Sequence, residues 1–213
     1  GKTTLFNCLT GITRPTKGAI SFFDREITGL KPDNIVKLGV ARTFQNIRLF
    51  REMTVIENVM VSQHCRTRSG LLPAIIRSSS FRDEEKAIRE KAIEHLELVG
   101  LEAYSGAIAG SLPYGSQKRL EIARAIATEP RLILLDEPTA GMNPQETREM
   151  MGLIKKLQEL GKTIILIEHD MRVVMGISEN IVVLDHGVKI AEGTPSEIKC
   201  NPMVIEAYLG KEH

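Results

Sequence analysis

The sequence predicts an α/β fold in which a helical segment is inserted between two halves of an open sheet. Two short apolar runs, at residues 132–135 and 163–167, end in charged side chains, as the buried strands of such sheets often do. Residues 53–101 have a helical pattern instead. We therefore expect a single domain over residues 1–213, with a helical subdomain at about 53–127.

The first element is a helix that starts at half of a phosphate-binding motif. Gly1, Lys2, Thr3 and Thr4 match the end of G-x-x-x-x-G-K-[ST], and an apolar helical pattern follows them. Backbone N–H groups at a helix start, together with an ammonium group, bind anions. An ordinary helix can start with the same residues, so the motif gains weight only if other parts of a phosphoryl-transfer site follow. In this interpretation the first glycine of the loop and the strand before it lie upstream of Gly1, and residues 1–213 alone bind ATP poorly.

The next segments predict short strands and then the helical segment. Residues 19–23 and 39–44 are predicted strands, the first followed by a turn at Asp24 and the second ending at Gln45. Residues 66–80 contain glycine, proline and three consecutive serines and predict a mobile connection. One apolar stripe runs along the helical segment, formed by Ile88, Ala92, Leu96 and Val99.

Polar residues follow both apolar runs. Asp136 and Glu137 come after the first run, and His169 lies just after the second. A carboxylate oxygen suits Mg²⁺, and a second carboxylate can polarise an attacking water. Because the carboxyl ends of strands converge in an open α/β sheet, we expect His169 to lie near Glu137. A plain core strand that ends in solvent would explain either run alone, but it explains less well the two runs and the phosphate half-motif in this order.

Capping residues mark the helices of the second half. Asn143 and Asn201 each precede a proline, and residues 194–197 form a capping box. Gly187 is the turn of a predicted hairpin. The helix predicted at residues 144–160 is expected to turn its apolar side inward, with Met150, Leu153, Ile154, Leu157 and Leu160.

A glycine-containing loop at residues 112–115 leads into an amphipathic helix with Leu120, Ala123 and Ile126 on one face. With this segment, the chain resembles the ATP-binding subunits of ABC transporters. The resemblance covers essentially the whole chain, and it implies a P-loop NTPase core of the ABC ATPase type that binds ATP and Mg²⁺. The family's phosphate loop, Q-loop, signature loop, Walker B acids and switch histidine match, in this order, Lys2, Gln45, Leu112, Asp136, Glu137 and His169.

The resemblance also implies roles for individual residues. Glu137 would act as the base on the attacking water, and Gln45 and His169 would complete the catalytic group at the γ-phosphate. The metal would be held by Thr3, Gln45 and Asp136. The signature loop of one subunit would cover the nucleotide of a second ATPase subunit, either identical or paralogous, so hydrolysis would need a dimer. The nucleotide-binding residues would be Gly1, Lys2, Thr3, Thr4, Gln45, Leu112, Gly115, Ser116, Gln117 and Asp136.

The signature loop departs from the family pattern Leu-Ser-Gly-Gly-Gln. Pro113 replaces the serine whose hydroxyl reaches the partner's nucleotide, Tyr114 replaces the first glycine, and Ser116 replaces the glutamine. Proline has no N–H to donate. The helix start after Gly115 still offers backbone N–H groups and a dipole. We therefore expect a contact that is weakened and not abolished.

Further sequence segments resemble those of the ATPases of bacterial branched-chain amino-acid importers. They lie at residues 50–59, 140–144, 167–171 and 208–210, and Tyr114 in the signature loop belongs to them. This resemblance implies transmembrane permease subunits as partners and a substrate-binding protein as an indirect one. It also implies a peripheral location at the cytoplasmic face of the plasma (inner) membrane.

Three other interpretations stay open. An ATPase of lipopolysaccharide export resembles the chain at its C-terminal end. A soluble ABC ATPase of DNA repair or translation would share Lys2, Asp136 and Glu137, but it would need a coiled-coil insertion or a second cassette, which 213 residues do not hold. A non-enzymatic nucleotide-binding remnant would not need the intact acid pair and His169.

Composition argues against several other classes. The chain has 213 residues, of which 42% are apolar, so it can bury a sizeable core. A net charge of +1 argues against a nucleic-acid surface. The longest apolar runs fall far short of the roughly 18 residues of a membrane span. Cys8, Cys65 and Cys200 lack metal-ligand spacing and favour reduced thiols over a disulfide framework.

Overall fold

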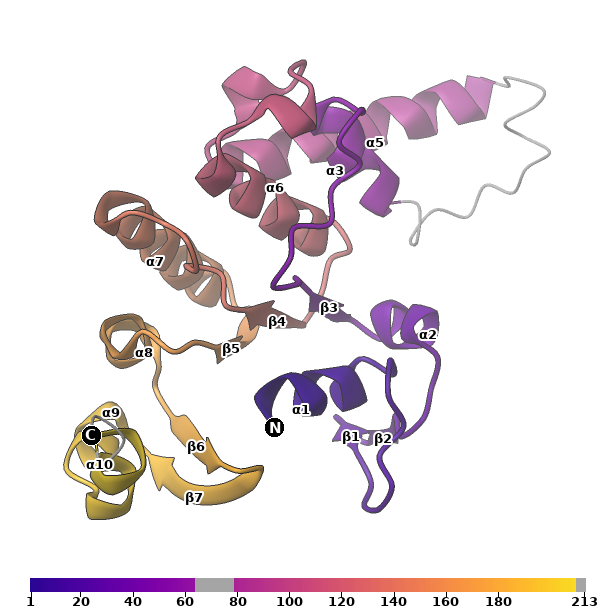
Figure 1. The fold of residues 1–213 in the computed structure, drawn as a ribbon. Coiled ribbons are helices and arrows are strands. Elements are labelled where there is room, and N and C mark those ends of the chain that lie inside the picture. Colours follow the sequence, from indigo (N-terminus) through magenta and orange to yellow (C-terminus); the bar gives the residue numbers. More distant parts are fainter. Residues whose placement is uncertain (64–78, 210–213) are drawn as a thin grey trace.

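The computed structural model describes residues 1–63 and 79–209 as an α/β fold with a parallel sheet at its centre (Figure 1). The strands are β1 (Ser21–Phe22), β2 (Arg25–Glu26), β3 (Val40–Arg42), β4 (Leu132–Asp136), β5 (Thr163–Ile167), β6 (Ile181–Asp185) and β7 (Val188–Gly193). The helices are α1 (Lys2–Leu9), α2 (Pro32–Lys37), α3 (Val55–Gln63), α5 (Ser79–Leu98), α6 (Tyr114–Ile126), α7 (Pro144–Glu159), α8 (Met171–Ile177), α9 (Pro195–Lys199) and α10 (Pro202–Leu209). Short 3₁₀ helices are η1 (Glu102–Tyr104) and η2 (Ala109–Ser111).

The central sheet has the parallel order β3-β4-β5. Every residue of β4 is buried, because a strand lies on each side of it and helices cover both faces. Ile133 and Leu135 face the large core that contains α6 and α7, whereas Leu132 and Leu134 face a smaller cluster with α1. This alternation is why the sequence of β4 is apolar at every position before Asp136.

β5 differs from the buried strand that the sequence predicts. Within it only Ile167 is buried, and Ile165 is 39% exposed. β5 pairs with β4, and no strand of the described chain pairs with its other edge. The prediction of a buried strand was therefore wrong, because in the described chain β5 has a partner strand on one edge only, and its residues line an open space beyond the other edge.

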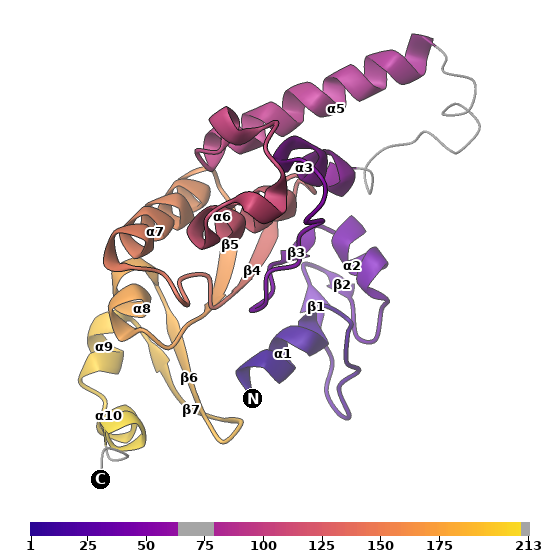
Figure 2. The same cartoon turned by 45° about the horizontal axis from the view of Figure 1, so that its top comes forward.

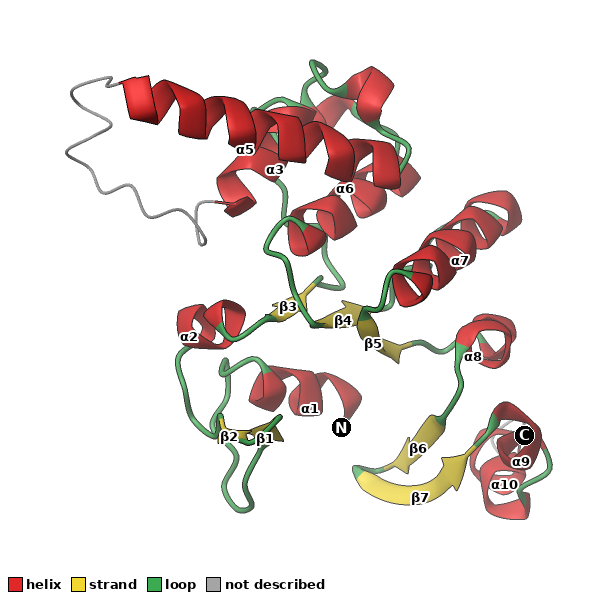
Figure 3. Ribbon diagram, turned by 180° about the vertical axis from the view of Figure 1, so that it is seen from behind, coloured by secondary structure: helices red, strands yellow, loops and turns green. Residues whose placement is uncertain are grey.

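That open space is an apolar cavity between β5 and β6. It has a volume of about 380 Å³ and is lined from α1, β5 and β6 by side chains that include Leu5, Ile165 and Val182. In the described residues β6 pairs with β7 alone. Figure 2 shows the two strands apart, with α1 nearby, and Figure 3 shows the β6–β7 pair as a hairpin separate from the central sheet.

Two hairpins flank the central sheet. The predicted hairpin at Gly187 is confirmed, with His186 and Gly187 at φ values of 46° and 86°, as a type I′ turn requires. The predicted strand at residues 19–23 is present but shorter, as β1, and after the turn it pairs with β2 in a hairpin. Phe23 has a φ of 49° and turns the chain one residue earlier than the sequence predicts.

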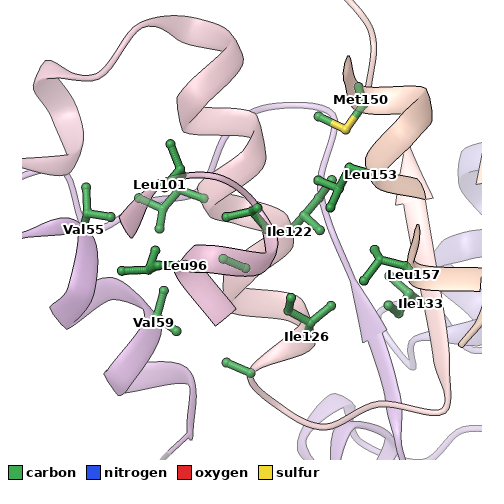
Figure 4. Packing of buried hydrophobic residues seen from close by; sticks show 14 of the residues in the cluster. Val55, Val59, Leu96, Leu101, Ile122, Ile126, Ile133, Met150, Leu153 and Leu157 are labelled. Carbon is green, nitrogen blue, oxygen red and sulfur yellow. The ribbon is translucent and has the colours of Figure 1, made fainter. Parts of the chain in front are cut away.

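One continuous core joins the helical insert to the sheet. As predicted, Ala92 and Leu96 of α5 and Val99 just after it are buried, while Ile88 is half-buried. The predicted apolar face of α6 is also buried. Figure 4 shows α6 between the insert helices and α7, with Ile122 and Ile126 between Leu96 on one side and Leu157 on the other. The insert therefore shares its core with the sheet.

The predicted helix starts of the second half are confirmed. Asn143 and Thr194 each form a capping box, and Asn201 accepts a hydrogen bond from the backbone N–H of Met203. On α7, four of the five predicted inward residues are buried, but Leu160 is 56% exposed because it is the C-cap and lies beyond the last helical residue.

The predicted connection at residues 66–80 lies outside the described residues, except for its last two residues, which already belong to α5. None of the described helices has the length and apolar content that a membrane span requires.

Candidate functional site

The three predicted catalytic side chains meet at the carboxyl ends of β4 and β5. The amide of Gln45 donates to one carboxylate oxygen of Glu137 at 3.1 Å. The imidazole Nδ1 of His169 lies 3.7 Å from the other oxygen. The prediction that His169 lies near Glu137 is therefore confirmed. Residues that are 92 positions apart in sequence, such as Gln45 and Glu137, share one carboxylate.

The backbone aims Glu137 out of the sheet. Glu137 has a φ of 49°, a left-handed conformation that is uncommon for a residue with a side chain. Its N–H donates to the carbonyl of Ile167 at 2.9 Å, which prolongs the β4–β5 ladder by one bond. Side chains held in such conformations concentrate at functional sites. Glu137 thus leaves the buried strand at a fixed angle and remains partly accessible to solvent.

Asp136, one residue earlier, is buried and points to the other side of the chain. Its Oδ2 accepts a hydrogen bond from the guanidinium of Arg42 at 2.8 Å. Both side chains are nearly inaccessible to solvent. Asp136 and Glu137 therefore occupy different environments, as two acids with different roles require. Arg42 was not among the residues singled out from the sequence.

α1 begins at Lys2, as the phosphate motif predicts, with Gly1 as its N-cap. Thr3 and Thr4 are exposed, and Lys2 is half-buried at the end of the apolar cavity. In the described chain no hydrogen bond joins Lys2 or Thr3 to Asp136. The predicted phosphate-binding residues of α1 and the predicted metal ligand at the end of β4 are therefore not linked directly.

The signature segment starts its helix earlier than the sequence predicts. α6 begins at Tyr114, with Pro113 as the N-cap, and Gly115 lies within its first turn. A β-carbon at Gly115 would lie 2.7 Å from Oε1 of Glu146, so a larger residue there would displace the Glu146 side chain. The predicted helix start after Gly115 was wrong because Pro113 itself supplies the extended residue that precedes a helix.

Other predicted signature residues turn inward. Leu112 is buried in the core, and the amide of Gln117 donates to the Leu112 carbonyl at 2.8 Å. Ser116 is buried and accepts a hydrogen bond from Arg119 at 3.2 Å. No hydrogen bond joins these residues to Glu137 or His169 within residues 1–63 and 79–209. Exposed groups at this loop are the side chains of Pro113 and Tyr114.

Sequence reasoning missed the side chains that hold the site together. The ammonium of Lys118, which is buried in α6, donates to the carbonyl of Gln45 at 2.9 Å. Burial lowers the pKa of Lys118, while the carboxylate of Glu121 opposes this shift. Glu121 in turn accepts hydrogen bonds from the N–H groups of Phe44 and Arg48, and burial raises its pKa. Two side chains of α6 thus form hydrogen bonds with the backbone at Gln45 and on both sides of it.

Glu168 plays a similar part beside His169. One of its oxygens accepts hydrogen bonds from the N–H and the hydroxyl of Thr139 at 3.0 and 2.6 Å, and the other accepts from the N–H of His169 at 3.2 Å. The carboxylate is buried. It therefore links the turn after Glu137 to the turn that carries His169.

The predicted metal ligands suit Mg²⁺ chemically. The hydroxyl of Thr3, the amide of Gln45 and the carboxylate of Asp136 are all oxygen donors, which hard cations prefer. The described residues contain no group of three or more His, Cys, Asp or Glu side chains that could hold a metal by themselves. Three protein ligands are few for a metal site. They suit an ion that takes its remaining ligands from phosphates and water, as Mg²⁺ commonly does.

Comparison with known proteins identifies this arrangement. A family model described as ABC transporter matches residues 1–140. The chain belongs to the ABC transporter family. A second model, described as branched-chain amino acid ATP-binding cassette transporter, matches residues 188–213.

Individual relatives agree with the family. The high-affinity branched-chain amino acid transport ATP-binding protein LivG of Salmonella typhimurium is 49% identical over 212 residues, which cover 99% of this chain and 83% of LivG. The protein of the same description from Pseudomonas aeruginosa, BraF, is 50% identical with the same coverage.

Solved structures share the fold. The ADP conformation of an ATP-binding cassette of an ABC transporter has a TM-score of 0.83 and 32% identity, covering 99% of this chain and 84% of its own. A dimeric post-hydrolysis cassette bound to ADP and Pi has a TM-score of 0.76 and 28% identity, covering 92% of this chain and 81% of its own. The P-loop NTPase core expected from the sequence is confirmed.

Proposed function

We propose that this chain binds ATP with Mg²⁺, hydrolyses it to ADP and phosphate as part of a dimer, and so powers the import of branched-chain amino acids. The observation that carries the proposal is the meeting of Gln45, Glu137 and His169 at the ends of two neighbouring strands. A phosphoryl-transfer site of this family needs a group that polarises water and groups that respond to the γ-phosphate.

Each side chain of the group has a role that its position supports. Glu137 accepts the proton of the attacking water, because it is the accessible member of the acid pair. Gln45 donates to one of its oxygens, the His169 ring lies 3.7 Å from the other, and both groups would meet the γ-phosphate. Asp136 would hold Mg²⁺ together with Thr3 and Gln45, and the bound ion would neutralise phosphate charge. Lys2 and the N–H groups at the start of α1 attract the phosphates.

A second subunit supplies the remaining contacts. In this proposal Leu112, Gly115, Ser116 and Gln117 of one chain approach the nucleotide of the other, which agrees with the lack of hydrogen bonds between them and Glu137 or His169 in the described residues of their own chain. A related cassette forms a dimer with ADP and Pi bound. Permease subunits would hold the dimer at the cytoplasmic face of the inner membrane, and a substrate-binding protein would deliver the amino acid.

Phosphate release from MgATP tests the catalytic part. In a chain extended ahead of Gly1 so that the phosphate loop is complete, we expect Glu137→Gln to lose most turnover, keep ATP binding and accumulate a nucleotide-bound dimer, because the amide occupies the same space but cannot accept a proton. Glu149→Gln, on the exposed side of α7, is the matched control and should retain turnover. Undiminished phosphate release by Glu137→Gln would refute the role of Glu137 as base.

Amino-acid uptake tests the transport part. The C-terminal match at residues 188–213 and the LivG and BraF relatives favour branched-chain amino-acid import over lipopolysaccharide export. We expect the chain, extended in the same way, to restore leucine uptake in Escherichia coli cells that lack LivG, and the Glu137→Gln variant not to do so. Growth without leucine uptake, or rescue of lipopolysaccharide export instead, would contradict the assignment of the substrate.

A further inference from the structure

We propose that Arg42 is a positioning residue that fixes Asp136 relative to α1, and so sets how the site uses Mg²⁺. The proposal rests on the proposed function, in which Asp136 holds the metal and α1 carries Lys2 and Thr3. The guanidinium of Arg42 contacts β4 and α1 at the same time.

The contacts of Arg42 are short and buried. Nη2 donates to Oδ2 of Asp136 at 2.8 Å, and Nη1 donates to Oδ1 of Asn7 at 2.7 Å and to the hydroxyl of Thr10 at 3.3 Å. The side chains of Arg42 and Asp136 are only 6% and 3% exposed. Asn7 and Thr10 lie on α1 and at its end. The guanidinium therefore joins the metal-binding carboxylate to the helix of the phosphate loop.

Strand register makes this connection possible. Arg42 pairs with Leu134, which lies two positions before Asp136, so Arg42 and Asp136 share one face of the sheet. α1 covers the same face through Phe6. The guanidinium lies 5.4 Å from the ring centre of Phe6 and 5.0 Å from that of Phe44. These rings and the α1 contacts hold Arg42 without help from a nucleotide.

Stability alone explains this pair poorly. A guanidinium stays charged in proteins and carries five donors, and here Nε is buried without a partner. Replacing a buried ion pair by apolar residues is often neutral or even stabilising. This buried pair includes the predicted metal ligand Asp136, so we infer that Arg42 serves to orient the carboxylate of Asp136.

The geometry leaves one oxygen of Asp136 for the metal. Arg42 occupies Oδ2, and within the described chain no hydrogen bond reaches Oδ1. Groups that orient a metal ligand in this way typically contribute about 10–100-fold to metal affinity or activity. Loss of the orientation should therefore appear in the Mg²⁺ dependence of nucleotide binding and leave metal-free binding unchanged.

Variants that preserve the charge separate orientation from electrostatics. Arg42→Lys keeps a cation but cannot donate to Asp136 and Asn7 with the same planar fork. Asn7→Ala keeps the whole guanidinium and removes its principal bond to α1. Calorimetric titration of ATP into each protein, extended ahead of Gly1 so that the phosphate loop is complete, over a series of Mg²⁺ concentrations and in EDTA, measures the effect. We expect Arg42→Lys to raise the half-saturating Mg²⁺ concentration about tenfold, and Asn7→Ala to raise it less, with ATP affinity in EDTA unchanged.

Arg131→Met is the control, because its guanidinium lies over the ring of Phe23 at 5.0 Å, away from the site. Its Mg²⁺ dependence should match that of the unchanged chain. Equal Mg²⁺ dependence in Arg42→Lys would overturn the proposal. A loss of affinity that is the same with Mg²⁺ and in EDTA would also overturn it, because Arg42 would then only support the fold. An extended chain without substitutions that binds no ATP at any Mg²⁺ concentration would contradict the proposed function itself, and this proposal with it.

Discussion

Pro113 leaves the start of α6 with backbone donors only. It is the N-cap of the helix and has no hydroxyl to offer. The first N–H groups of a helix have no backbone partner within it, and here they belong to Tyr114, Gly115 and Ser116. In the proposed dimer these donors would meet the nucleotide of the second subunit.

We expect Pro113→Ser to increase ATP-driven dimerisation or turnover. The added hydroxyl can donate to the opposite nucleotide, and a hydrogen bond to a charged group contributes about 1.5 to 3 kcal/mol. Light scattering with ATP measures dimerisation directly. Pro195→Ser, at the first residue of α9, is a control for the effect of removing a proline. Equal dimerisation of the Pro113→Ser and unchanged chains would show that the backbone donors already suffice.

Motifs identified the residues at the reacting centre better than the residues that support them. Gln45, Glu137 and His169 could be found because each follows a recognisable strand or motif. The supporting contacts of Arg42 and Lys118 depend on the fold: Arg42 and Asp136 are 94 positions apart, and Lys118 and Gln45 are 73 apart. No local pattern encodes such a pairing, because either partner alone is an ordinary polar residue.

At the level of elements, α7 has a start that serves two purposes. Asn143 accepts hydrogen bonds from the N–H groups of Gln145 and Glu146, and the Glu146 side chain accepts from the N–H of Asn143. The same Glu146 carboxylate lies against Gly115 of α6. The cap therefore also fixes where α7 meets the signature helix.

We expect Asn143→Ala to lower the free energy of unfolding by about 1 kcal/mol, because it removes the side chain that caps α7. Urea denaturation followed by circular dichroism measures the loss. Asn34→Ala is the matched control, since Asn34 lies inside the exposed part of α2 and is not a cap. A loss of the same size in the control would contradict the capping role.

Predictions of elements succeeded where the signal is local. Capping boxes and the Gly187 turn depend on a few neighbouring residues, and all of them are present. The burial of β5 and of Leu160 depends on what packs against them, which a hydrophobic pattern does not report. The apolar sequence of β5 is that of a strand with neighbours on both sides, whereas the described chain supplies one.

At the level of the whole molecule, the cavity between β5 and β6 separates the two sheets. Its apolar lining suits one further extended strand, whose hydrogen bonds would pair the edges of β5 and β6 that have no partner strand in the described residues. α1 begins beside this cavity, so a strand in it would lead directly into the phosphate loop.

We expect a chain extended ahead of Gly1 by an apolar strand and a glycine-rich loop to bind MgATP more tightly than residues 1–213 alone. The loop would complete the nest of N–H groups around the phosphates, and the strand would hold α1 in place. Calorimetric titration compares the two chains. An extension of equal length with a polar, scrambled strand is the control. Comparable affinity in all three would contradict the predicted place of Gly1 at the end of a longer loop.

The position of α6 has a consequence for how the molecule opens. Since its buried side chains pack against the insert on one side and against β4 and α7 on the other, neither part can detach without exposing apolar surface of both. Local unfolding follows the boundaries of cooperative units, and no such boundary crosses α6. Amide hydrogens of α6 and β4 should therefore exchange with solvent at one common slow rate, whereas those of the β6–β7 hairpin, which belongs to a separate apolar cluster, should exchange earlier.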